Sequence, residues 1–150
     1  MTPQPPVTVR AARSDELSEV EELLRQVRLP IEGIDRLAGL VLVAHAGGRV
    51  VGSAALELYH ASGLLRSVAV DPSFQGRGIG ARLTEATLSL ARDRRIRHIY
   101  LLTETASEFF PRFGFRVIGR GDVDPAVQQS EEFARLCPDS AVAMVLDLEG

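Results

Sequence analysis

The 150-residue sequence contains no lysine, no tryptophan and no asparagine. Lysine and arginine together number 17, so every one of these basic residues is arginine. The absence of lysine excludes a lysine nucleophile and a Schiff base. It also excludes a phosphate-binding P-loop of the usual form, which places a lysine on the phosphates. Arginine must therefore supply the permanent positive charge for any phosphate or carboxylate that this protein binds.

Cysteine and long apolar runs are also scarce. The single cysteine, Cys137, cannot form an internal disulfide, and we interpret it as a small apolar residue. No apolar run approaches the ~20 residues of a membrane span, and the start of the chain lacks the regions of a signal peptide. A net charge of −3 gives no general attraction to nucleic acid or anionic membrane. We therefore expect a cytoplasmic protein with one domain over residues 7–150, after a flexible tail at 1–6.

Hydrophobic periodicity and turn residues predict alternating strands and helices. Strands are expected at 7–11, 40–46, 49–59, 63–70, 99–103, 115–119 and 141–148, and helices at 15–26, 34–37, 79–95 and 106–113. Ser14 is expected to cap the first helix, Gly47-Gly48 to form a hairpin turn, Asp124-Pro125 to begin a helix and Cys137-Pro138 to end it. Strands 40–46, 49–59 and 63–70 should form an antiparallel meander. The unit from 63 to 103 should be a right-handed strand–helix–strand crossover with parallel strands.

The segment Gln75-Gly-Arg-Gly-Ile-Gly80 lies between a predicted strand and a predicted helix. Glycine lets the backbone turn tightly and approach a ligand closely. Backbone N–H groups at a helix N-terminus form an anion site, and a pyrophosphate is its natural guest. Arg77 and Arg82 add positive charge nearby. The alternative is that the glycines serve only the geometry of the turn from strand to helix.

The motif and its surroundings resemble the GCN5-related N-acetyltransferase (GNAT) superfamily. The resemblance rests on Gln75–Gly80, on the preceding strand Leu64-Leu-Arg-Ser-Val-Ala-Val-Asp-Pro72, and on Thr103–Phe115, a small helix ending in Gly-Phe. It implies an α/β fold with a mixed, mostly antiparallel sheet of six to seven strands, helices on both faces and a central parallel crossover unit. It also implies acetyl-CoA as cosubstrate. The residues implied for its binding are Val68, Ala69, Val70, Gln75, Gly76, Arg77, Gly78, Ile79, Gly80, Thr103 and Phe110.

A narrower resemblance concerns the strings at 63–70, 100–106 and 132–141. These look like N-acetyltransferases of bacterial arsenic-resistance operons and like small amino-acid N-acetyltransferases. The resemblance implies that the acceptor is the amine of a small molecule such as an amino acid, with a link to arsenic resistance as one option. We expect acetyl-CoA and this amine as partners, neither nucleic acid nor membrane, and a homodimer as one option.

The chemistry requires a base that removes a proton from the substrate ammonium. Glu57 and Glu104 are the candidates, although each could also be an ordinary solvated carboxylate. Arg66, inside an apolar strand, is expected to clamp a substrate carboxylate or to pair with one of these glutamates. Thr105 is assigned to the substrate with Arg66. No metal site is expected.

The sequence departs from the family at the general acid. Many members carry a tyrosine that protonates the leaving thiolate, and its position is Phe110 here, which has no proton to donate. Many members also carry an asparagine where this chain has Thr103. This departure keeps a second function open, a non-catalytic regulator that binds acyl-CoA. Acetylation of protein N-termini or lysines is a less favoured third alternative.

Overall fold

The structure, a computed structural model, describes residues 5–37, 39–130, 133–134 and 140–148. The chain divides into two compact units. The first unit comprises Met1–Leu56 and Ser67–Leu88, and the second comprises Glu57–Arg66 and Ser89–Gly150. The assignment of 7–150 to one domain and of 1–6 to a tail stays a prediction.

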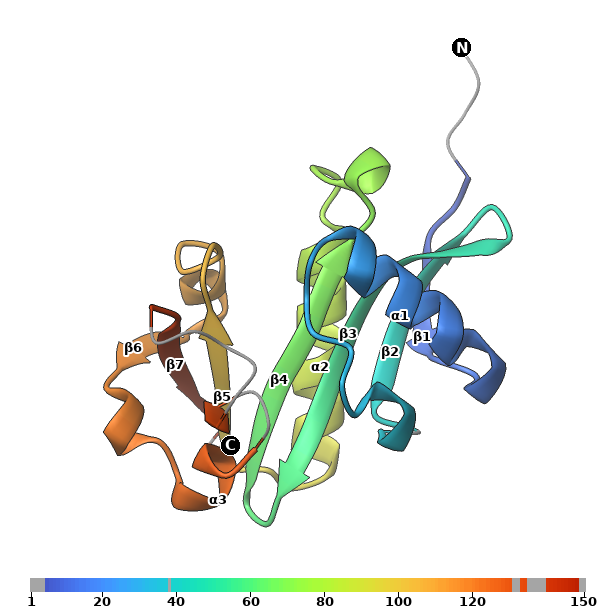
Figure 1. The fold of residues 1–150 in the computed structure, drawn as a ribbon. Coiled ribbons are helices and arrows are strands. Elements are labelled where there is room, and N and C mark those ends of the chain that lie inside the picture. The colour runs from blue at the N-terminus through green and yellow to red at the C-terminus, as the bar shows by residue number, and fades with distance from the viewer. Residues whose placement is uncertain (1–4, 38, 131–132, 135–139, 149–150) are drawn as a thin grey trace. The chain divides into compact units, whose positions relative to one another are not determined.

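Within the described residues, seven strands pair in the order β1-β2-β3-β4-β5-β7-β6 (Figure 1). The strands are β1 Thr8–Ala11, β2 Val41–Ala46, β3 Arg49–Tyr59, β4 Ser62–Val70, β5 His98–Thr103, β6 Arg116–Ile118 and β7 Val142–Asp147. The helices are α1 Leu17–Gln26, α2 Ile79–Asp93 and α3 Pro125–Gln128. The mixed sheet, its strand number and the parallel pairing of β4 with β5 confirm the predicted fold class. Among the described residues, no helix has the length and apolar character needed to cross a membrane.

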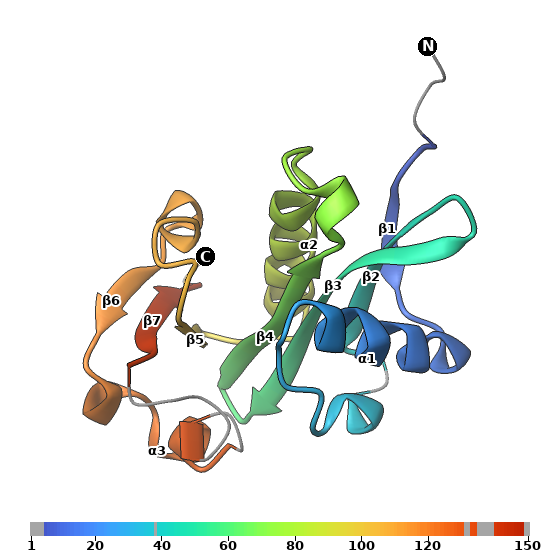
Figure 2. The same ribbon diagram turned by 45° about the horizontal axis from the view of Figure 1, so that its top comes forward.

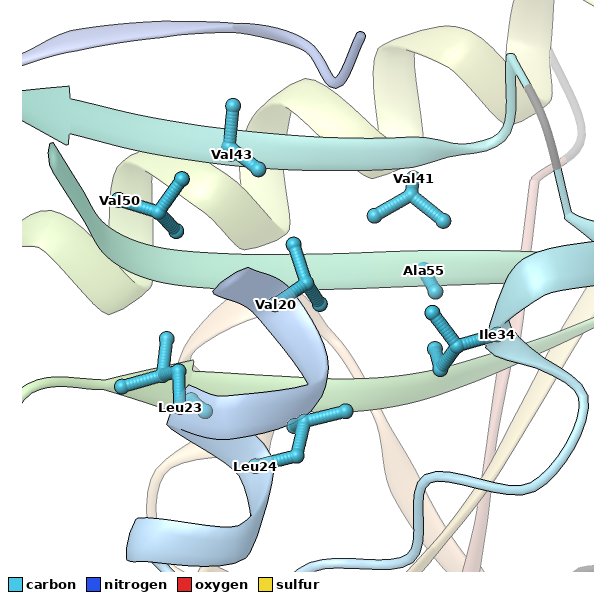
Figure 3. Packing of buried hydrophobic residues seen from close by; sticks show 9 residues of the cluster. Val20, Leu23, Leu24, Ile34, Val41, Val43, Val50 and Ala55 are labelled. Carbon is cyan, nitrogen blue, oxygen red and sulfur yellow. The ribbon is translucent and has the colours of Figure 1, made fainter. Parts of the chain in front are cut away.

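In the first unit, α1 covers one face of the antiparallel strands β1 to β3. Gly47 and Gly48 both have positive φ, 57° and 79°, which is the conformation of the predicted hairpin turn between β2 and β3. Val41 and Val43 of β2 and Val50 and Ala55 of β3 point toward the buried side of α1 (Figure 3). This core comprises Val20, Leu23, Leu24, Ile34, Val41, Val43, Val50, Ala55 and Ala69.

The beginning of α2 packs on the opposite face of the same strands (Figure 2). A Cβ atom added to Gly52 in β3 would lie 2.9 Å from a methyl carbon of Leu83 in α2. It would lie 3.2 Å from the Cβ of Ala44 in β2. The helices therefore cover both faces of these strands, as predicted, and glycine at position 52 allows the close approach of α2.

The second unit is built on β5. The first three residues of β4, Ser62–Leu64, pair in parallel with His98–Tyr100. The other side of β5 pairs antiparallel with β7, which in turn pairs antiparallel with β6. A second core fills this unit, and it includes Leu64, Tyr100, Val123, Val127, Ala143 and Val145.

Two local predictions were wrong. Ser14 does not cap the first helix; it is the first residue of a 3-10 turn, Ser14–Glu16, that precedes α1 and has Arg13 as its N-cap. The reason is that the Glu16 carboxylate accepts a hydrogen bond from the Arg13 backbone N–H at 2.8 Å, so the helical turn starts one residue earlier.

The helix expected at 106–113 is reduced to a 3-10 turn at Phe110–Phe113. Pro111 has no N–H with which to continue an α-helical hydrogen-bond pattern. The Cys137-Pro138 stop lies outside the described residues, as does Cys137 itself. Asp124 does cap α3 as expected, because its carboxylate accepts from the Ala126 N–H at 3.0 Å.

Candidate active site

The segment that connects β4 to α2 is fixed by Asp71, a buried carboxylate in the first unit. One of its oxygens accepts from both the N–H and the hydroxyl of Ser73, at 2.9 and 2.6 Å. The other accepts from the Arg49 guanidinium at 2.9 Å. These hydrogen bonds, those from Ser73 foremost, lower the pKa of Asp71, so the carboxylate stays ionised and holds the turn.

The glycine turn follows directly. Gly76 and Gly78 have φ of 81° and 77°, a left-handed conformation that side-chain-bearing residues rarely adopt. A Cβ atom added at either position would meet no other atom within 4 Å. The amide of Gln75 donates to the Val70 carbonyl at 3.1 Å and closes the turn. The backbone at these glycines is therefore open to a ligand, and α2 begins at the buried Ile79 with its first N–H groups available as donors.

Two arginines flank this turn. The guanidinium of Arg77 lies over the Phe74 ring at 4.9 Å and donates to the Ser73 carbonyl at 3.1 Å, while the side chain remains exposed. Arg82 is exposed and donates to the Val7 carbonyl at 3.1 Å. Arg77 thus brings positive charge to the turn, whereas Arg82 is used at least in part to hold the segment before β1.

The C-terminal end of β4 precedes the turn. Ala69 belongs to the core beneath α1, whereas Val68 and Val70 are half-buried. Ser67, just before them, is a buried residue with a positive φ of 59° inside the strand. The strand therefore carries an irregularity immediately before the residues assigned to the cofactor.

A charged cluster lies in the second unit. The Arg66 guanidinium donates to one oxygen of Glu57 at 2.8 Å, and the Tyr59 hydroxyl donates to the other at 2.5 Å. The side chain of Arg66 is 1% exposed and that of Glu57 is 16% exposed. Of the alternatives left open for Arg66, the structure shows the internal pair with Glu57. The carboxylate offsets the cost of burying the guanidinium.

Tyr59 is a member of the cluster that sequence reasoning did not assign. Burial and the hydrogen bond to Glu57 raise the pKa of Tyr59 well above its ordinary value. An interaction with the buried Ser130 acts in the opposite direction and lowers the pKa of Tyr59. The available signal was the strand period of two, which puts Tyr59 on the same face as Glu57. Ser130 carried no such signal, because its contact with Tyr59 depends on a distant loop.

The remaining predicted residues also belong to the second unit. Thr103 is buried, and its hydroxyl oxygen accepts from the Ala106 N–H at 2.9 Å. Phe110 is buried and makes edge contacts with Phe109 and Phe115 at ring distances of 5.1 and 5.8 Å. Glu104 and Thr105 are exposed. No group of three or more metal-ligating side chains was found in the described part of the chain.

The family model for the acetyltransferase (GNAT) domain matches residues 38–117. This stretch covers more than half of the chain and includes the glycine turn. The chain belongs to the GNAT acetyltransferase domain family.

Two curated relatives resemble parts of the chain. An amino-acid acetyltransferase of Mycobacterium tuberculosis is 38% identical over 104 residues, which cover 67% of this chain and 56% of the relative. The [citrate [pro-3S]-lyase] ligase of Klebsiella pneumoniae is 29% identical over 126 residues, which cover 82% of this chain and 35% of the relative. The chain therefore spans about half and about a third of the lengths of these two relatives.

Solved structures confirm the fold. Rv2747 from Mycobacterium tuberculosis, solved in complex with CoA, superimposes with a TM-score of 0.77 at 26% identity, covering 95% of this chain and 99% of that chain. N-acetylglutamate synthase from Neisseria gonorrhoeae, solved with coenzyme A and N-acetyl-glutamate, gives a TM-score of 0.83 at 20% identity, covering 99% of this chain and 36% of that chain.

The first unit has the chemical features that CoA requires of a pyrophosphate site. The two left-handed glycines expose their backbone, with open space where a side chain would otherwise lie. The 15-residue helix α2 begins directly after them, so its N-terminal N–H groups and its dipole favour an anion. Arg77 is exposed beside the turn. These residues fit a nucleotide pyrophosphate without any lysine.

Proposed function

We propose that the protein is a cytoplasmic, acetyl-CoA-dependent N-acetyltransferase that modifies the amine of a small molecule, an amino acid or an amino-acid-like compound. The observation that carries the proposal is the open turn at Gly76 and Gly78, followed by α2, in a chain of the GNAT family. The resemblance to an amino-acid acetyltransferase supports the choice of acceptor.

On this proposal, the turn binds the pyrophosphate of acetyl-CoA. Gln75–Gly80 supplies backbone N–H donors, and Arg77 supplies a charge-assisted contact. The backbone of Val68–Val70 pairs with the pantetheine arm and offers an N–H to the oxyanion that forms on the thioester carbonyl. Thr103 and Phe110 stay proposed contacts to the same cosubstrate.

The reaction joins the substrate nitrogen to the acetyl carbon and breaks the bond from that carbon to sulfur. A carboxylate first takes a proton from the ammonium, so that the nitrogen lone pair is free to attack. We assign this role to Glu57 or Glu104. Glu57 already accepts from Arg66 and Tyr59, which fixes its orientation, whereas Glu104 is exposed. When the bond to sulfur breaks, the nitrogen loses its second proton and the departing thiolate gains one. Because Phe110 cannot donate a proton, this transfer runs through water or through another residue.

We propose Arg66 as the clamp for the substrate carboxylate, with Thr105 as a further substrate contact. A guanidinium presents several N–H donors in a fixed plane, which suits recognition of a carboxylate. Glu57 orients the Arg66 side chain, which is almost fully buried. A buried and oriented guanidinium loses little conformational entropy when it binds an anion, and this favours carboxylate-bearing amines over simple amines.

The experiment is a thiol-release assay with acetyl-CoA and matched pairs of acceptors. Each pair contains an amino acid and the amine left after removal of its carboxylate, and the panel includes an arsenical amino acid. We expect thiol release that depends on the acceptor and favours the carboxylate-bearing member. Release that is independent of every acceptor would contradict the proposed activity.

A second candidate function is a non-catalytic regulator that binds acyl-CoA. Phe110, at the position where many family members have a proton-donating tyrosine, favours it. The same assay separates the two when CoA binding is measured beside it. CoA binding with no acceptor-dependent release supports the regulator, whereas binding together with release supports the enzyme.

A further inference from the structure

Ser67 has a backbone conformation unusual for its position. Arg28, His60, Ser67 and Arg95 are the described non-glycine residues with positive φ. The other three lie in turns, whereas Ser67 lies inside β4, with φ of 59°. A non-glycine residue keeps a left-handed conformation only where its surroundings impose it. The conformation of Ser67 therefore calls for a contact that holds it.

Ser53 provides such a contact from the neighbouring strand. Its hydroxyl donates to the Ser67 carbonyl at 2.7 Å. The Ser53 side chain is fully buried, with 0% exposure, and its neighbours Gly52 and Ala54 are buried as well. A hydroxyl in such surroundings is unfavourable unless it makes a hydrogen bond. Alanine would satisfy the packing requirement, so the specific contribution of serine is this hydrogen bond.

Gly52 brings the same stretch of β3 against the next residues of β4. A Cβ atom added at position 52 would lie 3.2 Å from the carbonyl oxygen of Ala69. This distance is tighter than an ordinary contact, so a side chain there would push on the β4 backbone. Gly52 and Ser53 therefore both affect the backbone of β4. Gly52 leaves room for the Ala69 carbonyl because it has no side chain, and Ser53 donates a hydrogen bond to the Ser67 carbonyl.

We propose that Ser53 is a positioning residue for acetyl-CoA. Its hydroxyl holds the irregular backbone at Ser67, and this fixes the direction of the peptide groups of Val68–Val70. The inference rests on the proposed function, in which those peptide groups pair with the pantetheine arm. Ser53 itself touches no substrate; it acts through the backbone of the adjacent strand.

The test compares Ser53→Ala with the matched control Ser62→Ala. Both variants remove a buried serine hydroxyl from a strand, and both break a hydrogen bond of 2.7 Å. The Ser62 hydroxyl donates to the Asp124 carboxylate, which the proposed reaction does not use. CoA affinity is measured by calorimetry, stability by thermal melting, and amide hydrogen exchange at residues 68–70 by mass spectrometry or NMR.

We expect S53A to weaken CoA binding about tenfold, because the peptide groups of residues 68–70 would then have to be ordered when CoA binds. It should also speed amide exchange at 68–70. S62A should lower the melting temperature while its CoA affinity stays within about twofold of wild type. Gly52→Ala, whose added Cβ would crowd the Ala69 carbonyl oxygen at 3.2 Å and a Leu83 methyl at 2.9 Å, should weaken CoA binding as well, and it perturbs the same stretch of β4 if S53A does not fold.

The outcomes distinguish failure of the positioning role of Ser53 from failure of the proposed function. Wild-type affinity for CoA in a folded S53A protein overturns the positioning role while the proposed function stands. Equal losses of affinity in S53A and S62A also overturn it, because the effect would then follow from stability alone. A wild-type chain that binds no CoA overturns the proposed function and the inference with it.

Discussion

The glycine turn permits a test in which backbone strain and ligand contact are separated. Gly78→Ala places a methyl group on a residue with φ of 77°, and Gly48→Ala does the same at φ of 79° in the β2–β3 hairpin. The added Cβ meets no other atom within 4 Å at either position. Each variant should therefore pay a similar cost for the left-handed conformation, roughly 1–2 kcal/mol.

The cost of the left-handed conformation sets the expected change in melting temperature. For a chain of this size, each kcal/mol lowers the melting temperature by about 2–4 °C. Both variants should therefore melt about 2–8 °C below wild type. At Gly78, however, the methyl group also enters the open space in which we expect the pyrophosphate. G78A should bind CoA at least tenfold more weakly, which corresponds to about 1.4 kcal/mol, whereas G48A should bind it as wild type does.

Calorimetric titration with CoA measures the difference, and a truncated cosubstrate sharpens it. Acetyl-pantetheine lacks the pyrophosphate, so its binding should be equal in wild type, G78A and G48A. Folded G78A with wild-type affinity for CoA would refute the assignment of the turn. So would a loss of affinity for acetyl-pantetheine equal to the loss for CoA, because the effect would then be independent of the phosphates.

Three further variants test the rest of the account. Arg66→Lys keeps the charge but loses the guanidinium plane, so kcat/KM should fall at least tenfold more for an amino acid than for its decarboxylated amine, and equal losses would refute the clamp. Tyr59→Phe removes the hydrogen bond to Glu57 and should lower kcat several-fold with acetyl-CoA KM unchanged; a change confined to that KM would contradict this role. Glu16→Gln should cost about 2 kcal/mol near pH 7, because Arg10 binds both oxygens of Glu16, at 2.7 and 2.9 Å. The Arg10 hydrogen bond lowers the pKa of Glu16 from 4.5 to about 2, so wild type should lose this advantage as the pH falls from about 4.5 to about 2, and an advantage that persists below pH 2 would contradict the pairing.

Most of the fold was predictable because its local signals agree with its tertiary structure. The hairpin glycines, the apolar spacing of α1 and α2, and the strand–helix–strand pattern each predict one arrangement, and the structure has it. The start of the first helix was predicted wrongly although the deciding contact is local. Glu16 accepts from the Arg13 backbone three residues earlier, and a glutamate at that spacing is a known capping residue, so Ser14 was the weaker of two local signals.

The candidate site was predictable to the same degree. Glycine residues indicate the turn because few other residues tolerate positive φ, whereas Ser67 adopts positive φ with no such signal. The pairing of Arg66 with Glu57 could not be singled out, because a buried arginine could equally pair with Glu104 or bind a substrate carboxylate. The role of Ser53 could not be predicted, because the sequence does not show which carbonyl accepts a hydrogen bond from a serine among apolar strand residues.

Acetyl transfer from CoA to a small amine can be followed with an isotopic label. The wild-type protein is incubated with acetyl-CoA that carries a deuterated acetyl group and with a mixture of amino acids, and the products are separated by mass spectrometry. Because the chain has no lysine, little labelling of the protein itself competes with the acceptor. We expect a deuterated N-acetyl amino acid in amounts that exceed the protein many times over. Label found only on the protein, or on no molecule besides CoA, would contradict it.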